Sequence, residues 1–409
     1  MTPRFGRRRC TVALALVLAA CGTVSQAGGS DGGSNGGGGS GGGGGGSAGQ
    51  WVLGYYVGYD IDAYPIADIE WTALSHIAFA PMTVADNLGL DLSFSDQHGT
   101  GTADAMALAR AAHSHGVVPL LMLGGAGAGA NIAAAAAPAH RSSFVADLLA
   151  VLDMLGYDGL DLDWEDSVDL DAFVALAQAL RAARPAIVLS YPANALNANL
   201  DTVDPRMVTL ARSLDRFNVQ TYYPSTAVAG LGWDSWFSSP VSGESATTPI
   251  AIDDTLSRYA AAGIPAAKLG LGMAFYAICY GGGVTGPRQP TSTATPILGG
   301  DNQYPLSSFF TAGGTFDASA ASARHRDATA QVPYLTLPAV VNDSGCRAGT
   351  QYITYDDETS IAAKGAFSRA HGYGGIILWT LQEGWLPRNA SGGRAPDALM
   401  QALRAGFLQ

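Results

Sequence analysis

One run of eight residues decides how this chain is read: Asp158-Gly159-Leu160-Asp161-Leu162-Asp163-Trp164-Glu165. As a β-strand, the run places Asp161, Asp163 and Glu165 on one face, because side chains two residues apart project the same way. The opposite face then takes Leu160, Leu162 and Trp164. Three carboxylates in a row on a buried strand repel one another and lose hydration, so folding alone does not explain them. The pattern predicts an active site.

Two structural alternatives, a solvated edge strand and a calcium-binding loop, fit the run less well. Leucines at alternate positions indicate a buried face, and the calcium pattern needs a glycine at its sixth position and a distant terminal Glu. Because like charges this close raise at least one carboxyl pKa, Glu165 is expected to be available as a protonated acid at neutral pH. A carboxylic acid beside a supporting carboxylate is suited to cleaving a glycosidic bond.

The run resembles the Asp-Gly-x-Asp-x-Asp-x-Glu signature of glycoside hydrolase family 18, the chitinases and their relatives, at all five fixed positions. The resemblance implies hydrolysis, with retention, of β-1,4 bonds next to N-acetylglucosamine, without a metal or cofactor. Glu165 would be the general acid and base. Asp163 would orient the substrate's own N-acetyl group, which attacks the anomeric carbon in place of a protein nucleophile. Asp161 would hold Asp163 and tune its charge.

The resemblance extends over most of residues 51–409. Independently of it, short apolar runs alternate with Ala-rich amphipathic segments such as 103–115 and 169–183, which predicts an α/β fold, a parallel (β/α)8 TIM barrel. Such a barrel carries catalysis at the C-terminal ends of its strands, where the acids of the fourth strand lie. The strands are expected within 51–56, 74–80, 117–125, 158–165, 187–193, 217–222, 268–276 and 374–379. A Gly-, Pro-, Ser- and Thr-rich insertion, about 277–349, predicts a small lobe between strands seven and eight.

Other site residues follow one by one from the resemblance. Tyr222 matches a tyrosine whose hydroxyl would bond the reacting acetamido carbonyl, although a packed tyrosine with a wet tip also fits. Trp379 matches the tryptophan that floors the sugar subsite, and a core position is its alternative. Gln220 replaces the usual Met and can donate or accept a hydrogen bond. Tyr55, on the first strand, is a further substrate-binding candidate.

The sequence also departs from the family pattern. Met122 stands where a serine is expected before two glycines, which removes a hydroxyl that could stabilise the buried aspartates. Ala126 stands where an aromatic residue is common, Asp166 where Tyr often follows the acid, and Tyr223 in place of an Asp. None of these changes touches the acids, so the chemistry is expected to survive while the substrate preference stays open.

Three tryptophans are candidates for a sugar-stacking platform, because sugars present apolar C–H faces. Loops after strands six and eight of a barrel surround the site. Those loops carry Trp233, Trp236 and Trp385. Large rings are more often core residues, so packing is the equal alternative.

Competing motifs are weak. The glycine-rich run 125–130 approximates a dinucleotide-binding turn, but it lacks a second strand and a terminal acid, and we expect a flexible loop over the cleft. His113 and His115 lack further ligands at zinc spacing, so a helix end is the better interpretation. The net charge of −12 argues against nucleic acid. A neutral N-acetylglucosamine-containing polysaccharide or oligosaccharide is the expected partner, bound by a monomer.

The N-terminus predicts export. Arginines precede a short apolar run, which indicates a signal peptide over 1–21 rather than a membrane span. Leu18-Ala19-Ala20-Cys21 resembles the lipobox of bacterial lipoproteins, with Cys21 lipidated; ordinary secretion with cleavage after Ala27 is the alternative. A Gly/Ser-rich linker over 22–50 would then tether the domain at a periplasmic or cell-surface membrane, its only membrane contact.

The exported domain retains two cysteines, Cys279 and Cys346, which bracket the insertion. An oxidising compartment favours a disulfide between them, but the sequence does not show that their Cα atoms are close enough.

Alternative functions for the same barrel also stay open. Peptidoglycan hydrolysis and endo-acting release of N-glycans use the same chemistry, and a chitin-binding lectin on the same barrel would usually lack the acid that Glu165 supplies here.

Overall fold

The structure is a computed structural model that describes residues 50–196, 202–222, 233–291, 304–341, 346, 350–386 and 393–409, without the side chains of 338–341. The predictions for Cys21, for the linker before Gln50 and for Tyr223 lie outside the described residues. Part of the predicted insertion, including 292–303, lies outside them too.

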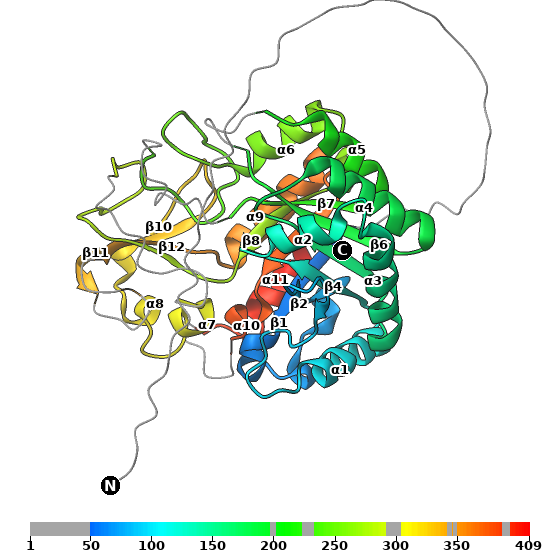
Figure 1. The fold of residues 1–409 in the computed structure, drawn as a ribbon. Helices are drawn as coiled ribbons and strands as arrows, with labels where there is room; N and C mark the ends of the chain where they lie inside the picture. Colours follow the sequence, from blue (N-terminus) through cyan, green and yellow to red (C-terminus); the bar gives the residue numbers. More distant parts are fainter. Residues whose placement is uncertain are drawn as a thin grey trace, which may run out of the picture.

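Eight parallel strands close into a barrel (Figure 1). They are β1 (Trp51–Val57), β2 (His76–Val84), β4 (Val118–Gly124), β5 (Gly159–Asp163), β6 (Val188–Asn194), β7 (Arg216–Gln220), β8 (Leu269–Ala274) and β13 (Gly375–Trp379). Closure comes from β1, which pairs in parallel with both β13 and β2. A short β3 (Leu90–Asp91) adds antiparallel to β2. The predicted (β/α)8 barrel is therefore confirmed.

Helices surround the barrel because alternate strand residues are apolar on the outer face. On β5, Leu160 and Leu162 pack into the shell between strands and helices, which leaves Asp161 and Asp163 on the inner face. The shell helices are α1 (Gly101–Ser114), α2 (Gly129–Ala136), α3 (Arg141–Leu155), α4 (Leu170–Ala183), α5 (Pro205–Ser213), α6 (Ile252–Ala261), α9 (Glu358–His371) and α11 (Ala398–Phe407). Shorter helical segments are η1 (Gly58–Ala63), η2 (Ile66–Asp68), η3 (Trp71–Ala73), η4 (Ala266–Lys268) and α10 (Leu381–Gly384).

The boundaries of these helices follow from local chemistry. The carboxylate of Asp169 accepts hydrogen bonds from the backbone N–H groups of Asp171 and Ala172 and so caps α4. Gly156 ends α3 with φ +81°, a left-handed conformation that glycine adopts without strain, and turns the chain into β5. Strand β5 therefore starts from a fixed point.

Trp51 fills the floor of the barrel at the N-terminal ends of the strands. Its indole Nε1 donates to Oδ1 of Asn218 over 3.0 Å, and the guanidinium carbon of Arg216 lies 5.1 Å from the ring centroid. Glycines make room for the ring: a Cβ added to Gly374 would lie 2.0 Å from Cζ3 of Trp51. The chain enters here, where the Gln50 side chain donates to Ser368 Oγ and the Tyr373 carbonyl.

A second sheet lies beside the barrel, between β8 and β13 in sequence (Figure 1). Its antiparallel order is β10 (Arg324–Arg326), β11 (Pro333–Val341), β12 (Thr350–Thr354) and β9 (Ile278–Tyr280), with α7 (Leu306–Phe309), α8 (Thr315–Ala318) and η5 (Ala321–Ala323) in the same segment. We call this sheet and its helices the lobe. A disulfide joins Cys279 and Cys346, whose Cα atoms are 5.9 Å apart. The lobe runs past the predicted boundary near 349, because β12 pairs with β9 and β11 rather than with the barrel.

Candidate active site

Three acids lie on β5 and directly after it, toward the C-terminal end of the barrel. Asp161 is fully buried and Asp163 is 4% exposed, both on the inner face of β5. The strand ends at Asp163, so Glu165 extends beyond it at the rim, where barrel enzymes place their chemistry. One carboxyl thus lies deep, one at the strand end and one at the opening.

Asp161 is held by two hydroxyl groups. Tyr55 donates to its Oδ2 over 2.8 Å, and Ser190 donates to its Oδ1. Burial raises the pKa of Asp161 to about 6, although both hydrogen bonds act to lower it. Ser190 was not among the predicted site residues; the parallel register that sets it opposite Asp161 on β6 is what brings it there.

The hydroxyl of Tyr55 therefore contacts Asp161, and its role in binding substrate stays a prediction. Its ring is 1% exposed and lies 5.2 Å, centroid to centroid, from the ring of Trp379. Met122 also faces this interior, in register with Asp161 on the neighbouring strand. The hydroxyl that Met122 does not provide is supplied by Tyr55 and Ser190.

Asp163 and Glu165 share a hydrogen bond. Burial raises the pKa of Asp163 well above its usual range, and the neighbouring charges of Glu165 and Asp161 raise it further. Two carboxyl groups can bond only when one is protonated, because a carboxylate has no donor. The expected rise in a carboxyl pKa is present, and it falls on Asp163 and Asp161.

Gln220, the last residue of β7, contacts the acid directly. Its Nε2 donates to Oε1 of Glu165 over 2.9 Å, with Oδ1 of Asp163 at 3.5 Å and the Pro192 carbonyl at 3.4 Å. The prediction placed Gln220 among the substrate-binding residues. In the structure its amide donates to the side chain of Glu165, and its contact with substrate stays a prediction.

Tyr222 and Trp379 are half-buried and lie where the barrel interior meets the lobe. Both pack against the interior cluster that contains Tyr55 and Met122, and both also pack against the lobe cluster that contains Tyr280. Trp379 ends β13 and Tyr222 follows β7 by two residues, so both stand at the C-terminal ends of strands. These are positions from which a ring and a hydroxyl can reach a bound sugar.

The platform prediction fails for two of the three tryptophans. Trp236 is fully buried: its Nε1 donates to the Ile250 carbonyl over 2.6 Å, and its ring packs with Phe237 and lobe residues. Trp233 is 6% exposed. A buried ring cannot offer its face to a sugar. Trp385 is half-buried, and its ring stacks on Tyr64 at 5.2 Å with 11° between planes.

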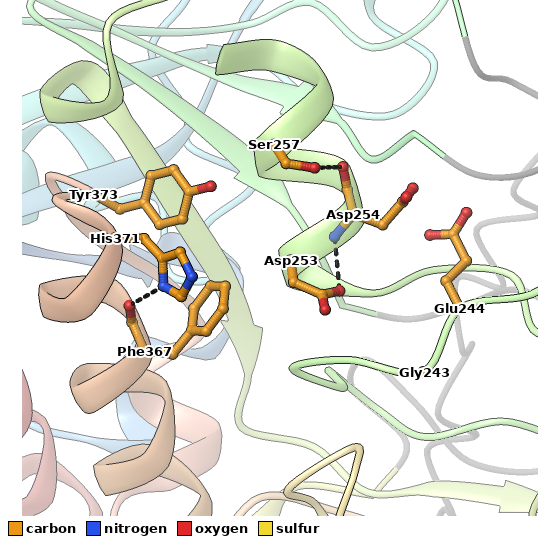
Figure 2. Close-up of a pocket in the computed structure, with 8 residues that line it drawn as sticks. All are labelled: Gly243, Glu244, Asp253, Asp254, Ser257, Phe367, His371 and Tyr373. Atoms are coloured by element: carbon orange, nitrogen blue, oxygen red, sulfur yellow. Dashed lines mark hydrogen bonds between the residues drawn. The ribbon is translucent and has the colours of Figure 1, made fainter. Parts of the chain in front are cut away.

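A separate pocket of about 370 Å³ opens between α6 and α9 (Figure 2). Glu244 lines one side of this pocket. Burial and the charge of Asp254 raise the pKa of Glu244 to about 8, while the charge of Arg258 acts to lower it. Aromatic side chains from the end of α9 line the other side, including His371 and Tyr373. None of the predicted site residues lines this pocket.

The remaining His, Cys, Asp and Glu side chains were also compared with the geometry of metal sites and helix ends. Within the described part of the chain, no group of three or more His, Cys, Asp or Glu side chains is arranged to hold a metal ion. His113 lies in the last turn of α1, where its Nε2 contacts Asp158 Oδ2 at 3.0 Å, and His115 stacks on Trp71. The interpretation of these histidines as a helix end agrees with the structure.

Among the described helices, none is long and apolar enough to cross a membrane.

Comparisons with known proteins identify a family and a shared fold. The sequence model of the glycosyl hydrolases family 18 matches residues 52–384. Chitotriosidase-1 of Mus musculus is 26% identical over 262 residues, which cover 59% of this chain and 53% of that protein. The chain thus spans about half the length of this curated relative.

Solved structures share the fold. The Group IV chitinase of Ostrinia furnacalis superposes with a TM-score of 0.71 at 19% identity, covering 88% of this chain and 100% of that one. A mutant class V chitinase from Nicotiana tobaccum, in complex with NAG4, superposes with a TM-score of 0.68 at 18% identity, covering 87% of this chain and 98% of that one.

Proposed function

Because this chain belongs to the glycosyl hydrolases family 18, we propose that it cleaves β-1,4 glycosidic bonds next to N-acetylglucosamine, with retention, and that its substrates are chitin or its oligosaccharides. The observation that carries the proposal is the row of Asp161, Asp163 and Glu165, deep to shallow, at the open end of the barrel. Its outer two carboxyls share a hydrogen bond.

In the first step, Glu165 gives its proton to the oxygen of the scissile bond as that bond breaks. The carbonyl oxygen of the substrate's own N-acetyl group forms a bond to the anomeric carbon, so no protein nucleophile is needed. Asp163 orients the N–H of this acetamido group, and the hydroxyl of Tyr222 bonds its carbonyl oxygen. Trp379 forms the floor beneath the sugar.

In the second step, water attacks the anomeric carbon and the acetamido oxygen leaves. Glu165, now a carboxylate, takes the proton of that water, which restores the acid. Two displacements at one carbon give retention. Asp161 keeps Asp163 in place from below, itself held by Tyr55 and Ser190.

Oligomers of N-acetylglucosamine are the favoured substrates because a class V chitinase of similar fold was solved with NAG4. In this proposal the sugar stacks on the half-buried ring of Trp379 and bonds the hydroxyl of Tyr222, which both lie at C-terminal strand ends. A ring and a hydroxyl group can both bind an uncharged ligand, as a neutral polysaccharide requires.

The test is hydrolysis of chitin oligosaccharides by the purified protein, with Glu165→Gln as the inactive variant and Asp147→Asn, an exposed change on α3, as the control. We expect cleavage by the wild type and the control, and loss with Glu165→Gln. Binding without cleavage by the wild type would favour a lectin. Neither binding nor cleavage would move the substrate to peptidoglycan fragments or N-glycans.

We also propose that the protein is exported and anchored through a lipid on Cys21. The support is the basic and apolar N-terminus followed by Leu18-Ala19-Ala20-Cys21. Metabolic labelling with a palmitate analogue should mark the wild type and not Cys21→Ser. Unlabelled protein released into the medium would indicate ordinary secretion instead.

A further inference from the structure

The connection between β4 and α2 is built almost entirely of glycine and alanine. We call residues 124–129 the glycine loop. Gly124, Gly125 and Gly127 have φ values of +119°, +100° and +83°, which residues with a side chain rarely adopt. Because the loop has no large side chains of its own, its position depends on what it is bonded to.

One carboxylate bonds the loop twice. Oδ1 of Asp166 accepts hydrogen bonds from the backbone N–H of Gly127 over 2.9 Å and of Gly129 over 3.2 Å. Gly129 is also the first residue of α2, where a negative charge is favourable. The fit is close, since a Cβ added to Gly129 would lie 1.7 Å from the Asp166 carbonyl oxygen. The loop is thus bonded to the residue that directly follows Glu165.

The same loop is bonded on the other side of the acid. The N–H of Gly125 donates to the Asp163 carbonyl over 2.8 Å. The indole of Trp164, itself 1% exposed, donates to the Asp166 carbonyl over 3.0 Å. The backbone of Glu165 therefore lies between two residues that are both attached to the glycine loop, one before it and one directly after it.

We propose that Asp166 is a positioning residue, which fixes the glycine loop against the end of β5 and thereby holds Glu165 in place for proton transfer. The inference rests on the proposed function of Glu165. Asp166 does not touch the reacting atoms in this assignment. Its effect is on geometry, and a misplacement of about 1 Å in a catalytic group costs roughly 100-fold in rate.

The experiment compares Asp166→Ala with Asp166→Asn in the full chain, using chitin oligosaccharides. Alanine removes the acceptor of both amides, whereas the side-chain oxygen of asparagine can still accept them. We expect kcat to fall by roughly tenfold or more in Asp166→Ala with KM within about twofold, and Asp166→Asn to recover most of the loss. Asp147→Ala, an exposed acid on α3, is the control.

Hydrogen exchange of a peptide covering the glycine loop gives a readout that needs no activity. The amides of Gly127 and Gly129 should exchange faster in Asp166→Ala than in the wild type, while exchange in β5 stays slow if the barrel is intact. Unchanged kcat in Asp166→Ala, with an active wild type, would overturn the inference and leave the proposed function standing. Unchanged exchange in the glycine loop would overturn it even if the wild type cleaves nothing.

Discussion

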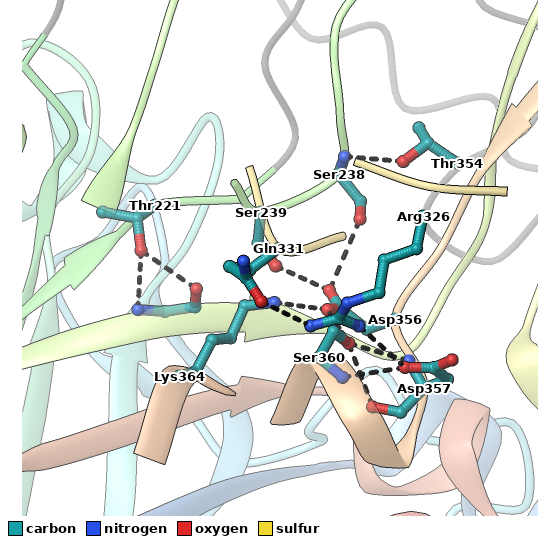
Figure 3. A network of polar contacts seen from close by, with 11 residues as sticks. Thr221, Ser238, Ser239, Arg326, Gln331, Thr354, Asp356, Asp357, Ser360 and Lys364 are labelled. Atoms are coloured by element: carbon teal, nitrogen blue, oxygen red, sulfur yellow. Dashed lines mark hydrogen bonds and ion pairs between the residues drawn. The ribbon is translucent and has the colours of Figure 1, made fainter. Parts of the chain in front are cut away.

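Lys364 and Asp356 form an ion pair whose two side chains are both completely buried, where α9 meets the lobe (Figure 3). Burial lowers the pKa of Lys364, and the charge of Asp356 opposes that change. The remaining acceptor positions of Asp356 are filled by the hydroxyls of Ser238, Ser239 and Ser360. This carboxylate therefore joins the segment before α6 to α9.

Removing only the cation should strongly destabilise the protein. In Lys364→Met, Asp356 stays buried without its counter-ion, and we expect the free energy of unfolding to drop by about 3–5 kcal/mol. The double variant Lys364→Met with Asp356→Asn removes both charges and should recover much of that loss. Arg326→Met breaks a partly exposed pair, 3.9 Å from Asp357, and should cost about 1 kcal/mol or less. Denaturant unfolding compares them, and equal losses in the single and double variants would contradict the argument.

Asp161→Asn should stabilise the protein at neutral pH while it lowers activity. The folded-state pKa of about 6 exceeds the ordinary value of 3.8, so the folded state holds this proton more tightly. The stabilisation is present at low pH and is lost as the pH rises from about 4 to about 6. Without an ionisable group the variant escapes this loss, which is worth up to about 3 kcal/mol at pH 7.

Thermal unfolding of wild type and Asp161→Asn at pH 3.5 and pH 7 checks the direction of this change in stability. The difference between the two proteins should be small at the lower pH and favour the variant at the higher one. A variant that is less stable than the wild type at pH 7 would mean that the hydroxyls of Tyr55 and Ser190 cannot turn to suit an amide.

Gly374→Ala should destabilise the floor of the barrel. The added methyl would lie 2.0 Å from Cζ3 of Trp51 and 2.3 Å from the Ala267 carbonyl oxygen, so ring or backbone must shift. We expect a loss of about 1–3 kcal/mol or more in the free energy of unfolding. Gly286→Ala is the matched control, because its nearest neighbour is the end of the Gln289 side chain at 3.4 Å. Equal midpoints for the two variants in urea would count against a tightly packed floor.

Gln220→Met should slow catalysis by removing the amide that donates to Glu165. Methionine has a similar length but cannot donate, and a typical hydrogen bond is worth about 0.5–1.5 kcal/mol. We expect kcat to fall by roughly two- to tenfold, with a small change in thermal midpoint. Gln401→Met, on the exposed side of α11, should leave kcat unchanged. If the two variants have the same kcat, the contact between Gln220 and Glu165 has no part in the reaction.

The barrel was predictable because its signals are local and repeated. Alternation along residues 158–165 placed Asp161 and Asp163 on one face and the leucines on the other, as the structure has them. Asp169, at the predicted start of a helix, caps α4. The strand predicted to end at Tyr222 ends at Gln220, since strand ends depend on pairing partners that the sequence does not display.

Contacts between distant segments could not be predicted. The hydrogen bond from Ser190 to Asp161 depends on the register between β5 and β6, and nothing in an apolar strand marks its one serine as a partner. Trp236 follows the barrel strands in sequence like a cleft residue, yet it is completely buried and packs with Phe237, Ala330 and Val332. Asp166 was recognised as a departure from the family pattern, but its partners lie in another loop.

Trp51 closes one end of the barrel, and the chain enters at that closed end, with Gln50 bonded to Ser368 and to the Tyr373 carbonyl. The acids lie at the other end. A tether that ends at Gln50 would therefore leave the barrel from its closed floor. The opening of the site would stay clear of the point of attachment, so attachment and catalysis would use opposite poles of the same barrel and would not compete for space.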